Sequence, residues 1–167
     1  RSAVHGVEVL LRSGLRPTLR FGRPAAVLTV PDRQPYVFLT EVVAGMLEHE
    51  DQGEGGIARR ASLEAWEEAG LRVSADAVQV LGRVFMSPGC SPEACYLAVA
   101  EVAADAVAAP PAGDGSPMEE GGFQPWVALH QALAQCDRGD IEDGKTEILL
   151  RRLAARLDAT SPSATRR

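Results

Sequence analysis

Short apolar runs, broken by glycine, proline and polar residues, divide the first part of the chain into segments of strand length. β-Branched and aromatic residues are frequent in these runs, which is typical of strands in a half-buried sheet. Ser13 and Gly14 favour a turn between the first two runs, and Gly45 marks the end of the last one. The pattern therefore predicts strands over residues 7–14, 16–22, 24–30 and 35–45.

The rest of the chain alternates helical and strand patterns. A helix is predicted from about residue 57 to 69, because Gly70 offers a C-terminal cap. Near the C-terminus, Ile148, Leu149, Leu153 and Leu157 recur on one side of a second amphipathic helix. The further predicted segments are strands over 77–87, 94–102 and 125–129, a turn over 88–93, helices over 129–139 and 145–157, and a long loop over 103–122.

Composition limits the class of protein. The chain has 167 residues, of which 46% are hydrophobic, so we expect a single domain over residues 1–157 and a disordered tail over 158–167. A net charge of -6 disfavours nucleic acid and anionic membranes as partners. No apolar run reaches the roughly 20 residues that span a bilayer, and a signal core is lacking, which favours a cytoplasmic location. Three cysteines without paired spacing favour buried thiols.

The stretch EAWEEAG gathers three carboxylates on the first predicted helix. Glu64, Glu67 and Glu68 stand at positions i, i+3 and i+4, so their side chains project from one helix face. Each like-charge pair there costs roughly 0.2–0.5 kcal/mol unless cations neutralise it. A solvated charged face is one interpretation. The other is a hard divalent cation held by carboxylate oxygens, which would suit phosphate chemistry.

The segments VVAGMLE, EAWEEAGL and SPGCSPE, at residues 42–48, 64–71 and 87–93, occur in an order that resembles the Nudix hydrolases. The family signature is a glycine, five residues, a glutamate, seven residues, Arg-Glu, an apolar residue, any residue, Glu-Glu, any residue, glycine and an apolar residue. The AG before this signature and the SPG after it resemble the branch that hydrolyses ADP-ribose and other nucleoside diphosphate sugars. The resemblance implies an α/β/α sandwich with a mixed β-sheet, and a homodimer in which the strands of residues 1–23 take part.

The resemblance also implies roles for individual residues. Glu64, Glu68 and the Ala44 carbonyl would bind Mg²⁺, or Mn²⁺ in its place, and Glu67 would be a further ligand or a catalytic support. Either Glu119 or Glu120, on the long loop, would orient or deprotonate the attacking water; a solvated loop tip is the alternative for both. The residues that the resemblance places near the substrate are Glu41, Ser87, Pro88, Gly89 and Glu93. Glu54 and Gly70 would support the structure.

Two features depart from the signature. Leu63 stands where an arginine is expected before Glu64, and it cannot orient a carboxylate; Arg59 or Arg60 would have to compensate. Gly45 and Glu64 are also nineteen positions apart, where the signature has fifteen. The first glutamate of the signature then corresponds to Asp51 or Glu54; we favour Glu54, which is closer to the predicted helix.

The expected activity is magnesium-dependent hydrolysis of the diphosphate in a nucleoside diphosphate sugar such as ADP-ribose, an ADP-sugar or a UDP-sugar. The products would be a nucleoside monophosphate and a sugar phosphate. One alternative is a weakly active or inactive Nudix-fold module that binds nucleotides, which Leu63 would permit. Another is a Nudix hydrolase that acts on a different class of nucleotide.

Overall fold

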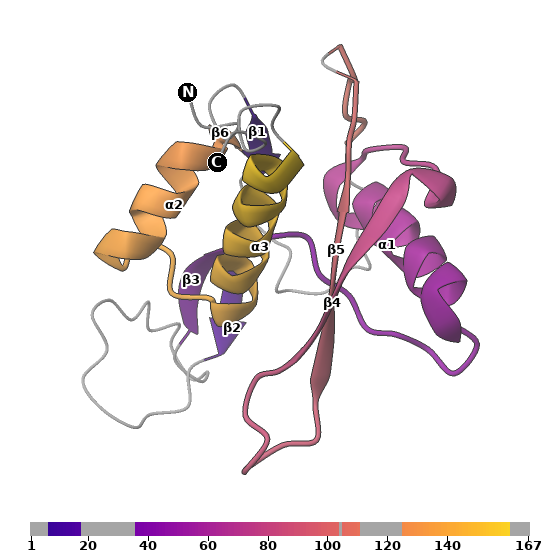
Figure 1. Ribbon diagram of the computed structural model, residues 1–167, viewed down its shortest axis with the longest axis horizontal. Helices are drawn as coiled ribbons and strands as arrows, with labels where there is room; N and C mark the ends of the chain where they lie inside the picture. Colours follow the sequence, from indigo (N-terminus) through magenta and orange to yellow (C-terminus); the bar gives the residue numbers. More distant parts are fainter. Residues whose placement is uncertain (1–6, 18–35, 104, 111–124, 161–167) are drawn as a thin grey trace.

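A computed structural model describes residues 7–17, 36–103, 105–110 and 125–160 (Figure 1). Both helices and strands occur along these residues. In chain order they are β1 (Glu8–Leu10), β2 (Arg12–Pro17), β3 (Tyr36–Glu41), α1 (Gly53–Ala69), the 3₁₀ helix η1 (Ala75–Ala77), β4 (Val78–Phe85), β5 (Ala94–Ala100), β6 (Trp126–Ala128), α2 (Leu129–Arg138) and α3 (Gly144–Thr160).

The strands of the described residues form antiparallel pairs. β1 pairs with β6, β2 with β3, and β4 with β5. The fold is therefore α+β, with helices and small antiparallel sheets. Within the described ranges these pairs do not join into the mixed sheet that the resemblance implies, and the strand expected over 24–30 lies outside those ranges.

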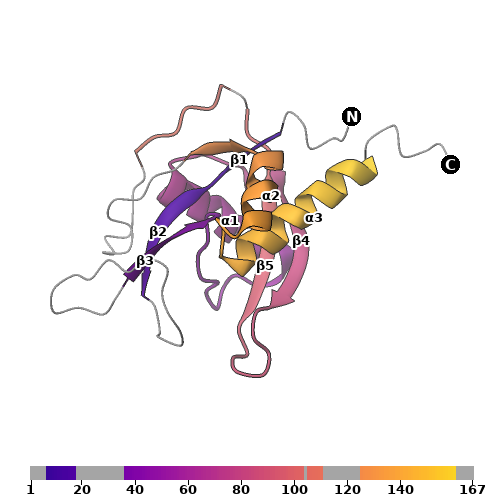
Figure 2. The ribbon, with the colours of Figure 1, turned by 90° about the vertical axis from the view of Figure 1, so that its left-hand side faces the viewer.

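The β4–β5 hairpin lies between two helices. Figure 1 shows α1 on one side of the hairpin and α3 on the other, and the view in Figure 2 agrees with this order. α2 lies beside α3, on the side away from α1 (Figure 1). The β4–β5 hairpin is thus covered by α1 on one side and by α3 on the other.

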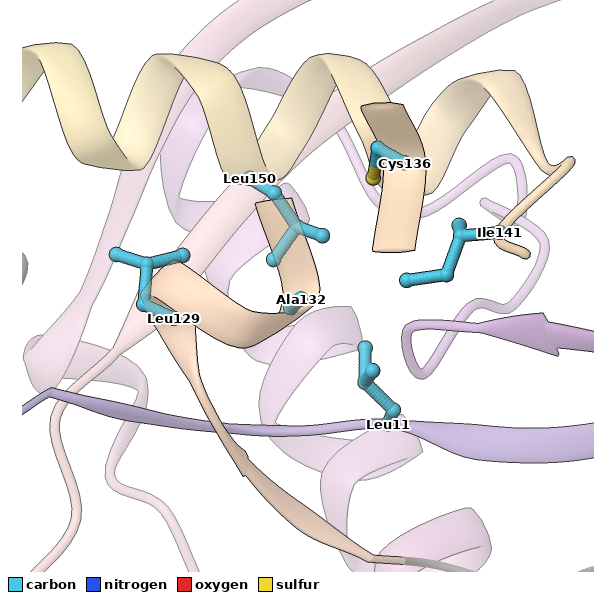
Figure 3. Packing of buried hydrophobic residues seen from close by; sticks show 6 residues of the cluster. All are labelled: Leu11, Leu129, Ala132, Cys136, Ile141 and Leu150. Atoms are coloured by element: carbon cyan, nitrogen blue, oxygen red, sulfur yellow. The ribbon is translucent and has the colours of Figure 1, made fainter. Parts of the chain in front are cut away.

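The apolar core lies where β1, β6, α2 and α3 meet. Its fully or largely buried members are Leu11, Leu129, Ala132, Cys136, Ile141 and Leu150 (Figure 3). Leu11 enters this cluster from the link between β1 and β2, and its N–H donates to the Pro125 carbonyl at 3.0 Å. Each buried leucine contributes about 1.5–3 kcal/mol relative to an exposed one. Leu153 and Leu157 pack against the same cluster from α3, as their spacing predicts.

The three cysteines differ in burial. Cys136 belongs to the core and Cys95 is half-buried, whereas Cys90 is exposed on the turn between β4 and β5. The prediction of buried thiols is therefore wrong for Cys90. Burial raises the pKa of the Cys95 and Cys136 thiols, which makes both of them less reactive at neutral pH.

Helix α1 begins earlier than its sequence pattern predicts. It starts at Gly53, whose φ of 66° is a left-handed value that glycine tolerates. The predicted C-terminal cap is confirmed, because Gly70 has a φ of 64°. The segment that follows β5 crosses this end of the helix, and the Ala109 N–H donates to the Gly70 carbonyl at 2.9 Å. Glycine is therefore required at position 70 for both conformation and space.

Three predicted boundaries differ from the structure. The turn at Ser13 and Gly14 is wrong, because both residues belong to β2 and pair in register with β3. β3 ends at Glu41 rather than Gly45, since the Val42 N–H leaves the sheet and donates to the Thr146 side chain. α3 continues to Thr160, into the predicted tail; the Thr160 hydroxyl donates to carbonyls of the preceding turn.

Candidate functional site

The acidic face of α1 lies directly against the chain that follows β3. The Ala44 N–H donates to Oε2 of Glu68 at 3.1 Å. A Cβ atom at Gly45 would overlap the Glu64 carboxylate, so this carboxylate lies directly against the backbone of Gly45 and a larger residue there would displace it. The structure thus brings together Ala44, Glu64 and Glu68, the three residues that the resemblance assigns to metal binding. The atom of Ala44 that meets Glu68 is its amide nitrogen, whereas the resemblance invokes its carbonyl.

A nearly buried arginine from β2 completes this cluster. Arg12 forms an ion pair with Oε1 of Glu68, and the two side chains are only 5% and 11% exposed. Directly across the β2–β3 pair from Arg12 is Glu41, which is 2% exposed. Charges this deeply buried are retained only when partners compensate their lost hydration. Arg12 is therefore a buried cation that pairs with Glu68 and stands in register with a second buried acidic residue, Glu41.

A second arginine, Arg60, lies near the carboxylates of Asp51 and Glu64. Arg60 Nε is 2.8 Å from Oδ2 of Asp51, and its Nη1 is 3.9 Å from Oε1 of Glu64. The Glu48 N–H also donates to Oδ2 of Asp51, at 2.9 Å. The bond from Glu48, followed by the bond from Arg60, holds the pKa of Asp51 below its ordinary value. Of the two arginines that could compensate for Leu63, Arg60 is the one that contacts the acidic face.

Glu41 connects the cluster to the start of α3. Lys145 Nζ is 4.0 Å from Oε2 of Glu41 and 2.6 Å from Oδ1 of Asp143. Asp143 accepts the Thr146 N–H at 3.0 Å and its hydroxyl at 2.6 Å, which caps the N-terminus of α3. Burial raises the pKa of Asp143, but the bonds from Lys145 and Thr146 outweigh this effect, so its pKa is below the ordinary value. β3 and α3 are thus joined by a polar junction.

Glu67 and Glu54, the other acidic residues for which the resemblance implies a role on this helix, lie near opposite ends of α1. Glu67 is half-buried on the helix, next to Glu68 in the chain. Glu54 is exposed in the first turn, where it lines a surface hollow of about 350 Å³ together with Asp51 and Tyr96. Asp51, rather than Glu54, is the residue tied to Arg60 and hence to Glu64. The sequence left Asp51 and Glu54 as alternatives for the first glutamate of the signature. The ion pair with Arg60 favours Asp51 over Glu54.

The predicted substrate turn is exposed. Ser87, Pro88, Gly89 and Glu93 all lie at the surface, on the connection between β4 and β5. Figure 1 shows this connection projecting past the helices. Its base is near the start of α3, because a Cβ atom at Gly144 would lie 2.9 Å from the end of the Met86 side chain. Glu119 and Glu120 lie outside the described residues.

Leu63 occupies the outer side of α1. It is 42% exposed and lines a shallow depression of about 260 Å³ with Arg59, Trp66 and Arg72. The Arg72 guanidinium lies over the Trp66 ring, 4.0 Å from its centroid. Leu63 and Arg59 therefore face a different surface from the one on which Glu68 meets Arg12.

Magnesium ions suit the donor chemistry of the cluster. Within residues 7–17, 36–103, 105–110 and 125–160, no group of three acidic, histidine or cysteine side chains could hold a metal ion by itself. Mg²⁺ in proteins usually keeps several waters and binds one or two carboxylates together with substrate phosphates. Glu64 and Glu68, beside the Ala44–Gly45 backbone, are carboxylates of this kind. The residues therefore fit an ion whose remaining ligands are water and phosphate.

Sequence reasoning missed Arg12, Asp143, Lys145 and Thr146. An arginine that directly follows the apolar run from Val9 to Leu11 was a signal for a buried charge. Asp143, three residues before Thr146 at the start of an amphipathic pattern, was a signal for a helix cap. The pairing of Arg12 with Glu68, 56 positions apart, carried no local signal.

Comparison with known proteins adds no relative: the sequence matches no protein-family model and no curated protein. None of the helices in the described part of the chain is both long and apolar enough to cross a membrane. The functional proposal therefore depends on the residues and their arrangement.

Proposed function

We propose that the chain is a Nudix-type pyrophosphohydrolase that hydrolyses the diphosphate of a nucleoside diphosphate sugar. The observation that carries this proposal is the convergence of Glu64 and Glu68 with the Ala44–Gly45 backbone. A solvated acidic face would leave these carboxylates in water. Here Glu68 is largely buried and the Glu64 carboxylate lies directly against the backbone of Gly45.

We also propose that the fold is an α/β/α sandwich of the Nudix kind. The layer order supports this, because the β4–β5 hairpin lies between α1 and α3 (Figure 1, Figure 2). The Glu68 carboxylate contacts β2 and the chain after β3, and the Glu64 carboxylate lies against Gly45, so these two carboxylates of α1 face the interior of the fold. The homodimer implied by the resemblance stays a prediction.

Individual residues would have separate roles in the proposed hydrolysis. Glu64 and Glu68 would hold magnesium, which when bound neutralises phosphate charge and lowers the pKa of a coordinated water. Arg12 and the Ala44 N–H hold the two oxygens of Glu68, so that this carboxylate keeps one orientation. Arg60 balances the charge of Glu64. Glu119 or Glu120 would take the proton of the attacking water.

A second candidate is a module that binds nucleotide sugars without hydrolysing them. The observation that favours it is that guanidinium groups accompany the carboxylates: Arg12 pairs with Glu68, and Arg60 lies near Glu64. Such pairs neutralise negative charge that a metal ion would otherwise neutralise. The position of Leu63 no longer favours this candidate, because it lies on the outer side of α1.

Turnover assays separate the two candidates. The full chain is incubated with ADP-ribose, ADP-glucose, UDP-glucose and a nucleoside triphosphate, each with and without magnesium, and product monophosphate is measured. We expect magnesium-dependent turnover of at least one nucleotide sugar. Glu68→Gln should lower kcat/KM by more than about a hundredfold, beyond the range usual for residues behind the metal ligands. The exposed Glu142→Gln serves as the control and should stay at the wild-type value.

Binding of a nucleotide sugar without magnesium-dependent turnover would contradict the hydrolase and support the binding module. Turnover of the triphosphate at a rate equal to that of the sugars would assign the chain to another nucleotide class of the same fold. Equal activity of the Glu68→Gln and Glu142→Gln variants would remove Glu68 from the site altogether.

A further inference from the structure

We propose that Arg12 is the positioning residue for the Glu68 carboxylate, and that strand β2 supplies the guanidinium that the signature helix lacks at position 63. The inference rests on the proposed function, since Glu68 matters for hydrolysis only if it holds the metal ion. It concerns a residue that the signature does not contain. The observation behind it is the buried ion pair between residues 56 positions apart.

Two donors hold the two oxygens of Glu68. Arg12 pairs with Oε1, and the Ala44 N–H donates to Oε2 at 3.1 Å. One donor alone would let the carboxylate rotate about its last side-chain bond, whereas donors on both oxygens fix its plane. A carboxylate offers about four lone-pair sites, so one donor on each oxygen does not by itself prevent it from binding a cation. Glu68 is thus oriented before any ligand arrives.

The other arginines near α1 have different tasks. Arg60 is 2.8 Å from Asp51 and 3.9 Å from Glu64. Arg59 lines the outer depression together with Leu63. An arginine at position 63 would start from that outer side, whereas Arg12 approaches Glu68 from β2. Although position 63 on α1 has no arginine, Glu68 therefore has a guanidinium partner, which comes from strand β2.

The geometry of a guanidinium is essential to this role. Its planar fork of N–H groups matches a carboxylate, whereas a lysine ammonium is a compact point charge on a flexible stem. Arg12→Lys keeps the charge and should preserve folding, but it should lose the fixed orientation of Glu68. A purely structural role for Arg12 would be satisfied by the retained charge. The two roles therefore predict different outcomes for the same variant.

The Ala44 amide provides a readout that does not require activity. In ¹⁵N-labelled full-length protein, we expect this amide proton to be shifted downfield and slow to exchange, because it donates to a carboxylate. Glu68→Ala provides the reference signal for the broken bond. In Arg12→Lys the Ala44 signal should move toward that reference, while in Arg59→Lys, a matched control on the outer side of α1, it should stay at the wild-type position. An unchanged Ala44 amide in Arg12→Lys would overturn the inference.

Kinetics then connect the position of Glu68 to the reaction. With the nucleotide sugar that the wild type turns over, Arg12→Lys should lower kcat by roughly ten- to a hundredfold, with KM within about threefold, since the loss concerns the reacting metal site. An active wild type with an unchanged kcat in Arg12→Lys would overturn the inference and leave the proposed function intact. A wild type without turnover would overturn the proposed function, while the Ala44 amide would still report whether Arg12 holds Glu68.

Discussion

Leu11 and Arg12 are neighbours in the chain, both nearly buried, and they enter two regions of opposite character. Leu11 joins the apolar cluster of α2 and α3, which also contains Leu129 and Leu150 (Figure 3). Arg12 enters the carboxylate cluster of β3 and α1, where it pairs with Glu68. Successive residues of an extended chain point to opposite sides, so one short segment serves both regions.

The two regions differ in how closely they specify their residues. Apolar contacts are non-directional, so the core region accepts another apolar side chain of similar volume at modest cost. The carboxylate region requires a particular donor at each oxygen, because a buried charge without its partner is strongly destabilising. We therefore expect substitutions in the core to change mainly stability, and substitutions in the carboxylate region to change function as well.

Truncation in the core gives the largest expected effect on stability. Leu150→Ala should lower the free energy of unfolding by about 2–5 kcal/mol, because it removes a buried side chain and leaves a cavity. Urea denaturation followed by circular dichroism measures this change. Leu157→Ala, at the half-buried edge of the same cluster, should cost less. Equal costs for the two variants would contradict the location of the core.

The glycines that cap the C-termini of α1 and α2 allow a direct comparison, because α1 carries the carboxylate region and α2 belongs to the core region. Gly70 and Gly139 both have left-handed φ values, of 64° and 78°. A Cβ atom at Gly70 would also overlap the Ala109 carbonyl, whereas nothing lies within 4 Å at Gly139. Gly139→Ala should therefore cost only the strain of about 1–2 kcal/mol, and Gly70→Ala should cost more. A melting temperature that falls equally in both variants would show that the segment at Ala109 does not pack on α1.

The polar junction at α3 gives a smaller effect that depends on pH. Asp143→Asn should cost about 0.3–1 kcal/mol at neutral pH, because asparagine can keep the helix cap but loses the negative charge at the N-terminus of α3 and beside Lys145. The pKa of Asp143 is lowered in the folded protein, so the unfolded chain binds its proton more tightly. This contribution is complete above the unfolded pKa of about 3.9 and is lost as the pH falls through the lower folded pKa.

Unfolding of the wild type and of Asp143→Asn across this pH range checks the sign. The difference in free energy of unfolding between the two proteins should shrink as the solution is acidified below about pH 4. A difference that grows on acidification would mean that burial, rather than the bonds from Lys145 and Thr146, controls the pKa of Asp143.

Local patterns in the sequence predicted those elements whose signals are local. The cap at Gly70, the β4–β5 hairpin and the two C-terminal helices all follow from spacing and turn residues. The start of α1 was missed because glycines occupy its first turn and weaken the helical pattern. The turn predicted at Ser13 and Gly14 failed because pairing with β3, a non-local interaction, outweighs their turn preference.

The candidate site was predictable only on α1 itself. Glu64 and Glu68 follow from the signature, and their spacing places them on one helix face. Their surroundings depend on contacts between distant segments: Arg12 comes from β2, and the Ala44 amide from the chain after β3. In the sequence, Leu63 departs from the arginine of the signature. In the folded chain, however, it lies on the outer side of α1, away from the contact between Glu68 and Arg12.

Manganese titration, followed by electron paramagnetic resonance of the free ion, tests most directly whether the acidic face of α1 binds a divalent cation. The wild type and the exposed-site control Glu142→Gln should bind Mn²⁺ with equal affinity. The double variant Glu64→Gln, Glu68→Gln should lose this binding, because it removes both proposed carboxylate ligands. Equal Mn²⁺ affinity in all three proteins, or none in the wild type, would contradict a metal site on this face.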